Sequence, residues 1–221
     1  MHETSDPHAG MPVLTAGAPL SSARAAVIAI HGRGATPDDI LQLQPAFGIA
    51  DVAWLAPEAA GRSWYPYRFI AETAMNQPFL DSALGRIQAL VDQIVVAGLP
   101  HESIVLLGFS QGACLSSEFA ARHPRRWGGV VALSGGLIGP PGTKWETPGS
   151  LDRTPILVGC SDVDEHIPLA RVEETARVLE QMGGDVTLRI YPGLGHTVVP
   201  DEIEIGRRII EGAKRPPATT R

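Results

Sequence analysis

The sequence has no long hydrophobic run. A membrane-spanning helix needs about 20 consecutive apolar residues, and Gly, Pro, His or charged residues interrupt every apolar stretch of this 221-residue chain before that length is reached. The first ten residues are polar and acidic, and they lack the basic and apolar regions of a signal peptide. We therefore expect a protein that does not bind a membrane and that works in the cytoplasm.

Cysteine and positive charge are also scarce. The two cysteines, Cys114 and Cys160, cannot form a disulfide framework. Each lies in an apolar context, so we expect both to be small buried hydrophobic residues. The net charge of −6 argues against a nucleic-acid-binding protein, which needs an excess of Lys and Arg. The one basic cluster, residues 122–126, falls where a helix is expected to end, and positive charge suits that end.

Patterns that bind metals or cofactors are missing as well. No pair or triple of His and Cys residues has the spacing of metal ligands, and no glycine cluster matches a Walker A or dinucleotide fingerprint. We therefore expect neither a metal nor a cofactor. The hydrophobic content of 44% excludes a disordered chain. The length suits one domain, residues 1–212, followed by a disordered tail, residues 213–221.

Short apolar runs alternate with amphipathic segments along the chain. Strands are expected at residues 13–16, 27–30, 52–56, 104–107, 129–133, 155–159 and 186–191. Helices are expected at residues 36–44, 76–98, 111–122, 169–182 and 201–212, with Thr36 and Asn76 as the N-caps of the first two. This alternation predicts an α/β protein with a mostly parallel central sheet and helices on both faces.

Residues 104–122 show the strongest pattern in the chain. An apolar run is followed by GFSQG at residues 108–112 and then by a segment with helical periodicity. This is the G-x-S-x-G pattern in the strand–turn–helix context in which a serine serves as a nucleophile. The start of the helix would favour a negative oxygen forming beside Ser110. The alternative is a chance match in a chain with 24 glycines.

The loop after the expected strand at residues 27–30 reads HGRG. In a G-x-S-x-G hydrolase, one oxyanion donor is the backbone N–H of the residue after the nucleophile, here Gln111, and the other comes from a loop of this kind. The backbone N–H of Arg33 is therefore the natural second donor. The alternative is an ordinary Gly-rich turn from strand to helix.

Candidates for a base and its orienting acid follow two later strands. Catalytic groups in parallel sheets gather outside the carboxyl ends of the strands. The loop after residues 155–159 contains Asp162, Asp164 and His166, and the loop after residues 186–191 contains His196. The chain order Ser, Asp, His favours His196 as the general base, with His166 as its rival. Asp162 and Asp164 compete as the orienting carboxylate, and we favour Asp164.

An aromatic loop at residues 61–69 stands out in a chain with only 5% aromatic residues. Such a loop suggests a surface that meets an apolar substrate, and equally a loop that packs its own rings as a small satellite core. On the first interpretation, an open acyl groove is lined by Trp64, Tyr65, Ile138 and Leu194.

Several of these segments together resemble the phospholipase/carboxylesterase family of α/β-hydrolases, which includes small bacterial carboxylesterases and acyl-protein thioesterases. The resemblance is carried by HGRGA at 31–35, GFSQGA at 108–113, SGGL at 134–137, the acidic run at 162–168 and GLGH at 193–196. It implies the α/β-hydrolase fold without a lid domain. It also implies a catalytic triad of Ser110, Asp164 and His196, with the N–H groups of Arg33 and Gln111 as oxyanion donors.

The resemblance implies hydrolysis of carboxylic esters, or of thioesters, of small or short-acyl substrates through an acyl-serine. The sequence departs from the eukaryotic thioesterases at Arg33, at Cys160-Ser161 and in the loop at Trp64, and these departures are closer to the bacterial carboxylesterases. A lactone hydrolase of aromatic-compound degradation is an alternative, and a catalytically silent binding protein is a weaker one. We expect a small-molecule ester or thioester as partner, with a homodimer as a further possibility.

Overall fold

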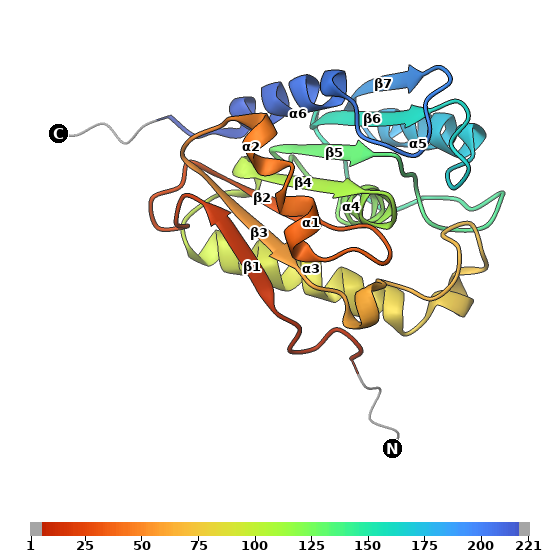
Figure 1. The fold of residues 1–221 in the computed structure, drawn as a ribbon, viewed down its shortest axis with the longest axis horizontal. Helices are drawn as coiled ribbons and strands as arrows, with labels where there is room; N and C mark the ends of the chain where they lie inside the picture. The colour runs from red at the N-terminus through yellow and green to blue at the C-terminus, as the bar shows by residue number, and fades with distance from the viewer. Residues whose placement is uncertain (1–5, 217–221) are drawn as a thin grey trace.

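Seven strands form one sheet in the computed structural model, which describes residues 6–216. The strands lie in the order β1-β3-β2-β4-β5-β6-β7 (Figure 1). They are β1 Val13–Gly17, β2 Ala25–Ile30, β3 Val52–Pro57, β4 Ile104–Phe109, β5 Gly129–Leu133, β6 Pro155–Ser161 and β7 Asp185–Tyr191. Only the edge pair of β1 and β3 is antiparallel among these strands. The predicted mostly parallel sheet is therefore confirmed.

Helices cover both faces of the sheet. They are α1 Pro37–Leu41, α2 Gln44–Phe47, α3 Phe79–Val96, α4 Gln111–Arg122, α5 Leu169–Gln181 and α6 Pro200–Ala213. Short 3-10 turns occur at η1 Ala60–Arg62, η2 Thr73–Asn76 and η3 His101–Ser103. One core cluster joins the sheet to α3, α4 and α5, and the other joins its opposite face to α1, α2 and α6 (Figure 1). This is the arrangement of an α/β-hydrolase fold.

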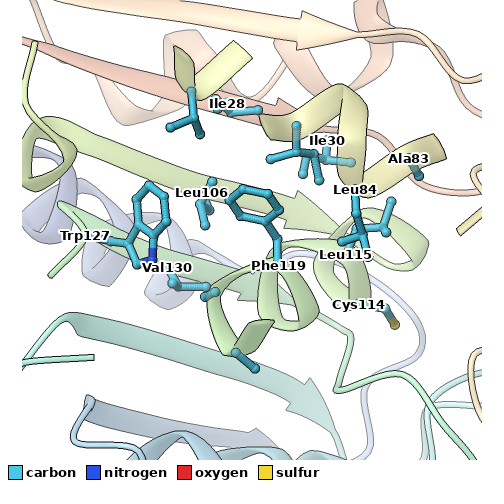
Figure 2. Packing of buried hydrophobic residues seen from close by; sticks show 14 of the residues in the cluster. Ile28, Ile30, Ala83, Leu84, Leu106, Cys114, Leu115, Phe119, Trp127 and Val130 are labelled. Atoms are coloured by element: carbon cyan, nitrogen blue, oxygen red, sulfur yellow. The ribbon is translucent and has the colours of Figure 1, made fainter. Parts of the chain in front are cut away.

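Alternation along the strands explains the two cores. In β2, every residue is buried, and successive side chains point to opposite faces. Ile28 and Ile30 therefore belong to the core under α3 and α4, while Val27 and Ala29 belong to the other. Figure 2 shows the first core, where strand residues meet helix residues and Trp127: Ile28, Ile30, Leu106, Val130, Leu84, Leu115 and Phe119. Burying each large apolar side chain contributes about 1.5–3 kcal/mol.

The strand register brings the carboxyl ends of the strands to one edge of the sheet. Ile30 at the end of β2 pairs with Gly108 of β4, and Phe109 pairs with Leu133 at the end of β5. The loops that follow β2, β4, β6 and β7 therefore open on the same side. These are the loops that carry the residues predicted to be functional.

Two predicted helices differ from the structure. The helix expected at residues 36–44 begins as predicted, with Thr36 as its N-cap, but α1 ends at Leu41 and a separate short helix, α2, begins at Gln44, because Pro45 has no N–H to donate to the carbonyl of Leu41 in a continuous helix. The helix expected from Asn76 begins at Phe79 after Pro78. Asn76 is not its cap: the side chain of Asn76 accepts the N–H of Tyr67 at 2.9 Å and so braces the aromatic loop.

The last described residues, which include the start of the expected tail, make contacts with the rest of the chain. Arg215 donates its backbone N–H to the carbonyl of Arg24 at 3.0 Å, and its guanidinium reaches the carbonyl of Gly98 at 3.1 Å. The first part of the expected disordered tail is therefore held against the sheet and the end of α3. The rest of that tail, residues 217–221, lies outside the described residues. None of the helices between residues 6 and 216 is long and apolar enough to cross a membrane.

Candidate active site

Ser110 lies at a sharp turn between β4 and α4. Its φ of 56° and ψ of −119° are unusual for a residue with a side chain, and such a conformation costs about 1–3 kcal/mol. The neighbouring glycines are required by packing. A Cβ at Gly108 would stand 2.2 Å from the backbone of Gly112, and a Cβ at Gly112 would stand 2.0 Å from the carbonyl oxygen of Ile30. The geometry is that of a nucleophile elbow.

His196 is oriented by a buried carboxylate. Its Nδ1 lies 2.7 Å from Oδ2 of Asp164, whose side chain is 0% exposed. The other oxygen, Oδ1, accepts the backbone N–H groups of His166 and Ile167 at 2.9 and 3.0 Å. Burial by itself would raise the pKa of Asp164, but the hydrogen bonds from His196 and from these N–H groups outweigh it and leave the pKa below its ordinary value. Asp164 is therefore ionised at neutral pH.

The competing carboxylate and the competing imidazole lie elsewhere. Asp162 is exposed and accepts the N–H of Gly193 at 2.8 Å, so it shapes the loop that carries His196. His166 is exposed at the rim, edge-on to the ring of His196 with centroids 4.9 Å apart, and its partner is Glu165 at 3.5 Å. The structure therefore brings together Asp164 and His196, and not Asp162 and His166.

The ring of His196 also packs against Phe109, the residue that precedes the nucleophile, with centroids 4.8 Å apart. Ser110 and His196 both line one surface cleft. Because Nδ1 of His196 is engaged by Asp164, Nε2 is the nitrogen left to serve the serine hydroxyl. His196 thus has the two features that a histidine base of a serine–histidine–aspartate site requires: a carboxylate on Nδ1 and an Nε2 without that partner.

The two expected oxyanion donors also line this cleft. Gln111 is the first residue of α4, and the first N–H groups of a helix have no partner within it. The loop that contains Arg33 passes close to Ser110, since a Cβ placed on Gly32 would stand 3.3 Å from Cβ of Ser110. The backbone N–H groups of Arg33 and Gln111 therefore come from the two segments that flank Ser110.

The side chains of these two residues have a role that the sequence did not reveal. Oε1 of Gln111 accepts the N–H of Trp64 at 2.9 Å, and its Nε2 donates to the carbonyl of Tyr65 at 2.9 Å. Arg33 donates through Nη1 to the carbonyl of Pro66 at 2.9 Å and through Nη2 to that of Tyr67 at 2.8 Å. The aromatic loop is therefore clamped by the side chains of both expected oxyanion residues. No local motif signals these contacts.

The predicted acyl groove is only partly where we expected it. Tyr65 lines the cleft, whereas Trp64, Ile138 and Leu194 do not. Trp64 is completely buried, and its Nε1 donates to the carbonyl of His31 at 2.9 Å, so this ring packs inward as the satellite core of the alternative interpretation. Ile138 is buried in the core beside α5, and Leu194 stands on the exposed surface.

The cleft has a volume of about 620 Å³. Its apolar walls come from the aromatic loop, from the end of β4 and from the loop after β6: Tyr65, Tyr67, Phe69, Phe109 and Ile167. A second pocket of about 450 Å³ adjoins it at Phe109 and His196 and extends to Ile40, Leu43 and Val198. The imidazole of His196 thus stands between a larger and a smaller pocket, and an ester could place one part in each.

Neither cysteine is a thiolate at neutral pH. Burial raises the pKa of Cys114 to about 12, and burial together with the nearby Asp164 raises that of Cys160 to about 12. The thiol of Cys160 lies 3.5 Å from Oδ2 of Asp164 and donates to it. Among residues 6–216, no group of His, Cys, Asp or Glu is placed to hold a metal ion.

Comparison with known families identifies the chain. Residues 14–212 match the model of the phospholipase/carboxylesterase family. The chain belongs to this family. Family membership makes it a carboxylesterase-type serine hydrolase with the α/β-hydrolase fold, as the motifs predicted.

Individual members of the family support the assignment. The chain is 30% identical over 213 residues to acyl-protein thioesterase 1 of Saccharomyces cerevisiae, covering 86% of this chain and 93% of the yeast protein. It is 24% identical over 199 residues to carboxylesterase SOBER1 of Arabidopsis thaliana, covering 82% and 87%. A solved phospholipase/carboxylesterase from Dyadobacter fermentans is 40% identical with a TM-score of 0.88, covering 91% and 97%. Esterase PE8 is 25% identical with a TM-score of 0.74, covering 91% and 97%.

Proposed function

We propose that this enzyme hydrolyses small carboxylic esters or thioesters with short acyl groups through an acyl-serine formed on Ser110. The observation that carries the proposal is the 2.7 Å hydrogen bond between buried Asp164 and His196, at a cleft that His196 shares with Ser110. A histidine held in this way has one fixed tautomer, with a proton on Nδ1 and a free lone pair on Nε2.

The first half of the reaction forms the acyl-enzyme. Oγ of Ser110 attacks the substrate carbonyl carbon while Nε2 of His196 takes the hydroxyl proton. The carbonyl oxygen becomes an oxyanion, and the N–H groups of Arg33 and Gln111 stabilise it. Asp164 stabilises the imidazolium that forms, because its carboxylate is ionised and buried beside Nδ1. The imidazolium then protonates the departing alkoxide or thiolate as the tetrahedral intermediate collapses.

The second half releases the acid. A water molecule takes the place of the leaving group, and Nε2 of His196, neutral again, removes its proton as it attacks the acyl-serine. The second tetrahedral intermediate uses the same oxyanion donors. Its collapse returns the proton from His196 to Ser110, so the enzyme is regenerated and a carboxylic acid leaves. The protein supplies every group that the chemistry needs.

The shape of the site supports small substrates. The cleft of about 620 Å³ is of moderate size for a ligand site. In the described chain no helix or strand is inserted between β5 and β6, so no lid element covers the cleft there. The same catalytic groups would also open a lactone, which stays the alternative substrate. A cytoplasmic location and a homodimer, both expected from the sequence, stay predictions.

A series of 4-nitrophenyl esters of increasing acyl length tests the proposal. We expect the largest kcat/KM with short acyl chains and no detectable turnover by Ser110→Ala. Ser22→Ala, in an exposed turn between β1 and β2, is the matched control and should behave as the wild type. A rate that keeps rising as the esters pass their solubility limit would contradict the short-acyl preference. An S-acyl thioester of the best chain length then decides between ester and thioester.

A further inference from the structure

The cleft beside Ser110 has a positively charged rim. Arg33, from the loop after β2, and Arg68, from the aromatic loop, both line it and are both exposed. No Asp or Glu is among the described residues that line the cleft. The chain as a whole has a net charge of −6, so these two arginines place positive charge at the mouth of a cleft in a protein that is negative overall.

We propose that the preferred substrate carries an anionic group, such as a carboxylate, in addition to its ester, and that Arg33 and Arg68 bind that group at the rim. The inference rests on the proposed function, since it concerns the substrate of the same site. The overall charge of the protein would repel an anionic substrate, so the proposed preference depends on the two arginines at the rim.

Arg33 is held in place before any substrate arrives. Its Nη1 and Nη2 each donate to a carbonyl of the aromatic loop, at 2.9 and 2.8 Å. Its guanidinium lies 5.9 Å from the centre of the Tyr65 ring. Backbone carbonyls fix a guanidinium without neutralising its charge, and its remaining N–H donors can still bind an anion. A fixed guanidinium loses little rotamer entropy when a carboxylate binds.

Arg68 is similarly free of a carboxylate partner. Its Nη2 donates to the backbone carbonyl of His166 at 3.4 Å. No carboxylate of the described chain lies within ion-pair distance of Arg33 or Arg68, whereas Arg122 and Arg171 each pair with a glutamate. Glu165, the residue before His166 in the chain, lies 3.5 Å from the imidazole of His166 and forms no ion pair with either arginine.

The smaller pocket on the other side of His196 has the opposite character. Most of its lining is apolar, and its polar residues are Thr197, the two histidines and Asp39. The carboxylate of Asp39 accepts the N–H and the hydroxyl of Thr36 at 2.8 Å. These hydrogen bonds lower the pKa of Asp39, so this pocket carries a negative charge at neutral pH. The contrast assigns an anionic part of the substrate to the arginine side and a neutral part to the smaller pocket.

Matched pairs of charged and neutral esters test the inference. One pair places the charge on the acyl side: the 4-nitrophenyl monoester of adipic acid and its methyl ester. The other places it on the alcohol side: the butyrate ester of glycolic acid and the corresponding glycolamide ester, followed by acid release. The measured quantity is the ratio of kcat/KM for the anionic ester to that for its neutral partner, after subtraction of spontaneous hydrolysis.

We expect the wild type to prefer the anionic member of at least one pair by about tenfold, mainly through KM, and to lose this preference as salt screens the charges. Arg68→Gln should lower the ratio about five- to tenfold, and Arg68→Glu should reverse the preference. Arg177→Gln, which removes an exposed arginine of α5 away from the cleft, should leave the ratio unchanged. Thermal unfolding of each variant checks that it is folded.

The outcomes separate the two proposals. Hydrolysis of the neutral esters by the wild type supports the proposed function, whatever the ratio. An anionic ester that is no better than its neutral partner in both pairs overturns the inference alone. The same holds for a preference that survives unchanged in folded Arg68→Gln and Arg68→Glu. Failure to hydrolyse any of the esters contradicts the proposed function and the inference with it.

Discussion

In the proposed catalytic triad, Asp164 is the residue that orients His196. Its two oxygens accept hydrogen bonds from the imidazole of His196, from two backbone N–H groups and from the thiol of Cys160. This number of donors holds a buried carboxylate in its ionised form and fixes its orientation. The ring of His196 is fixed in turn.

Asp164→Asn should lower kcat by about 10³- to 10⁴-fold, because an amide can donate to Nδ1 and so favours the wrong imidazole tautomer. Asp162→Asn is the matched control: the exposed side chain of Asp162 bonds only the N–H of Gly193 among the described contacts, and we expect less than about a fivefold loss. Turnover of a 4-nitrophenyl ester by the two folded variants gives the comparison. Equal losses would show that Asp164 is not the orienting acid.

At the scale of elements, the aromatic loop and the elbow helix act together. The side chain of Gln111 bonds the backbone of Trp64 and Tyr65, while its own N–H is an expected oxyanion donor. The loop that forms the wall of the cleft is thus tied to the residue that follows the nucleophile. The two hydrogen bonds therefore link the position of the aromatic loop to that of the start of α4.

Gln111→Ala keeps the backbone N–H but removes both loop contacts. We expect about a tenfold lower kcat/KM and faster hydrogen exchange at the N–H of Trp64, which loses its acceptor. Gln111→Glu keeps an acceptor for that N–H and should therefore protect it while losing the bond to the carbonyl of Tyr65. Equal exchange rates at Trp64 in the wild type and Gln111→Ala would show that the clamp does not hold the loop.

The start of α6 contains another buried carboxylate, Glu202. Oε2 of Glu202 accepts the N–H of Val199 at 2.9 Å, and Oε1 has no hydrogen-bond partner among the described residues. A Cβ on Gly159 would stand 2.1 Å from Oε1, which shows how closely β6 covers it. Burial raises the pKa of Glu202 to about 7 from an ordinary value of 4.5.

This pKa gives stability a pH dependence of known sign. The folded protein keeps the proton of Glu202 at pH values where the unfolded chain has released it, so the contribution is complete below about pH 4.5 and is lost as the pH rises through about 7. Between about pH 5 and about pH 8, the free energy of unfolding of the wild type should fall by up to about 3 kcal/mol relative to Glu202→Gln. Denaturant unfolding at a series of pH values measures this. Parallel curves for both proteins would contradict it.

Most of the elements were predictable because strands and helices leave a local signal. The buried apolar runs of β2 and β4 and the helical periodicity of α4 are visible without tertiary information. The errors are in two helix boundaries, where a proline interrupts the helical periodicity. Pro45 ends the first predicted helix early, at Leu41, and the N-cap of α3 is Pro78, two residues after the expected cap at Asn76.

At the scale of the whole molecule, the parallel sheet is what assembles the site. Residues 33, 110, 164 and 196 come from loops after four different strands, and the register places all of those strand ends on one side. The sequence predicted these residues because glycine-rich and acidic motifs follow buried strands. The structure confirms the predicted fold of the chain, and the family match confirms its predicted family.

The lining of the cleft was less predictable. Whether an aromatic ring faces a substrate or the core depends on partners far away in the sequence. Trp64 is turned inward by the carbonyl of His31 and by His8, whose Nε2 donates to the carbonyl of Trp64 at 3.0 Å. The sequence did not predict that Arg68 lines the cleft, because an isolated arginine in a loop belongs to no recognisable sequence pattern. These features come from tertiary contacts alone.

The central claim is that Ser110 is an activated nucleophile, and the mass of the intact protein after exposure to an activated fluorophosphonate tests it most directly. We expect one covalent adduct on the wild type and on Ser22→Ala, none on Ser110→Ala, and much slower labelling of His196→Ala, because the serine then lacks its base. An unlabelled but folded wild type, or labelling that persists in Ser110→Ala, would contradict it.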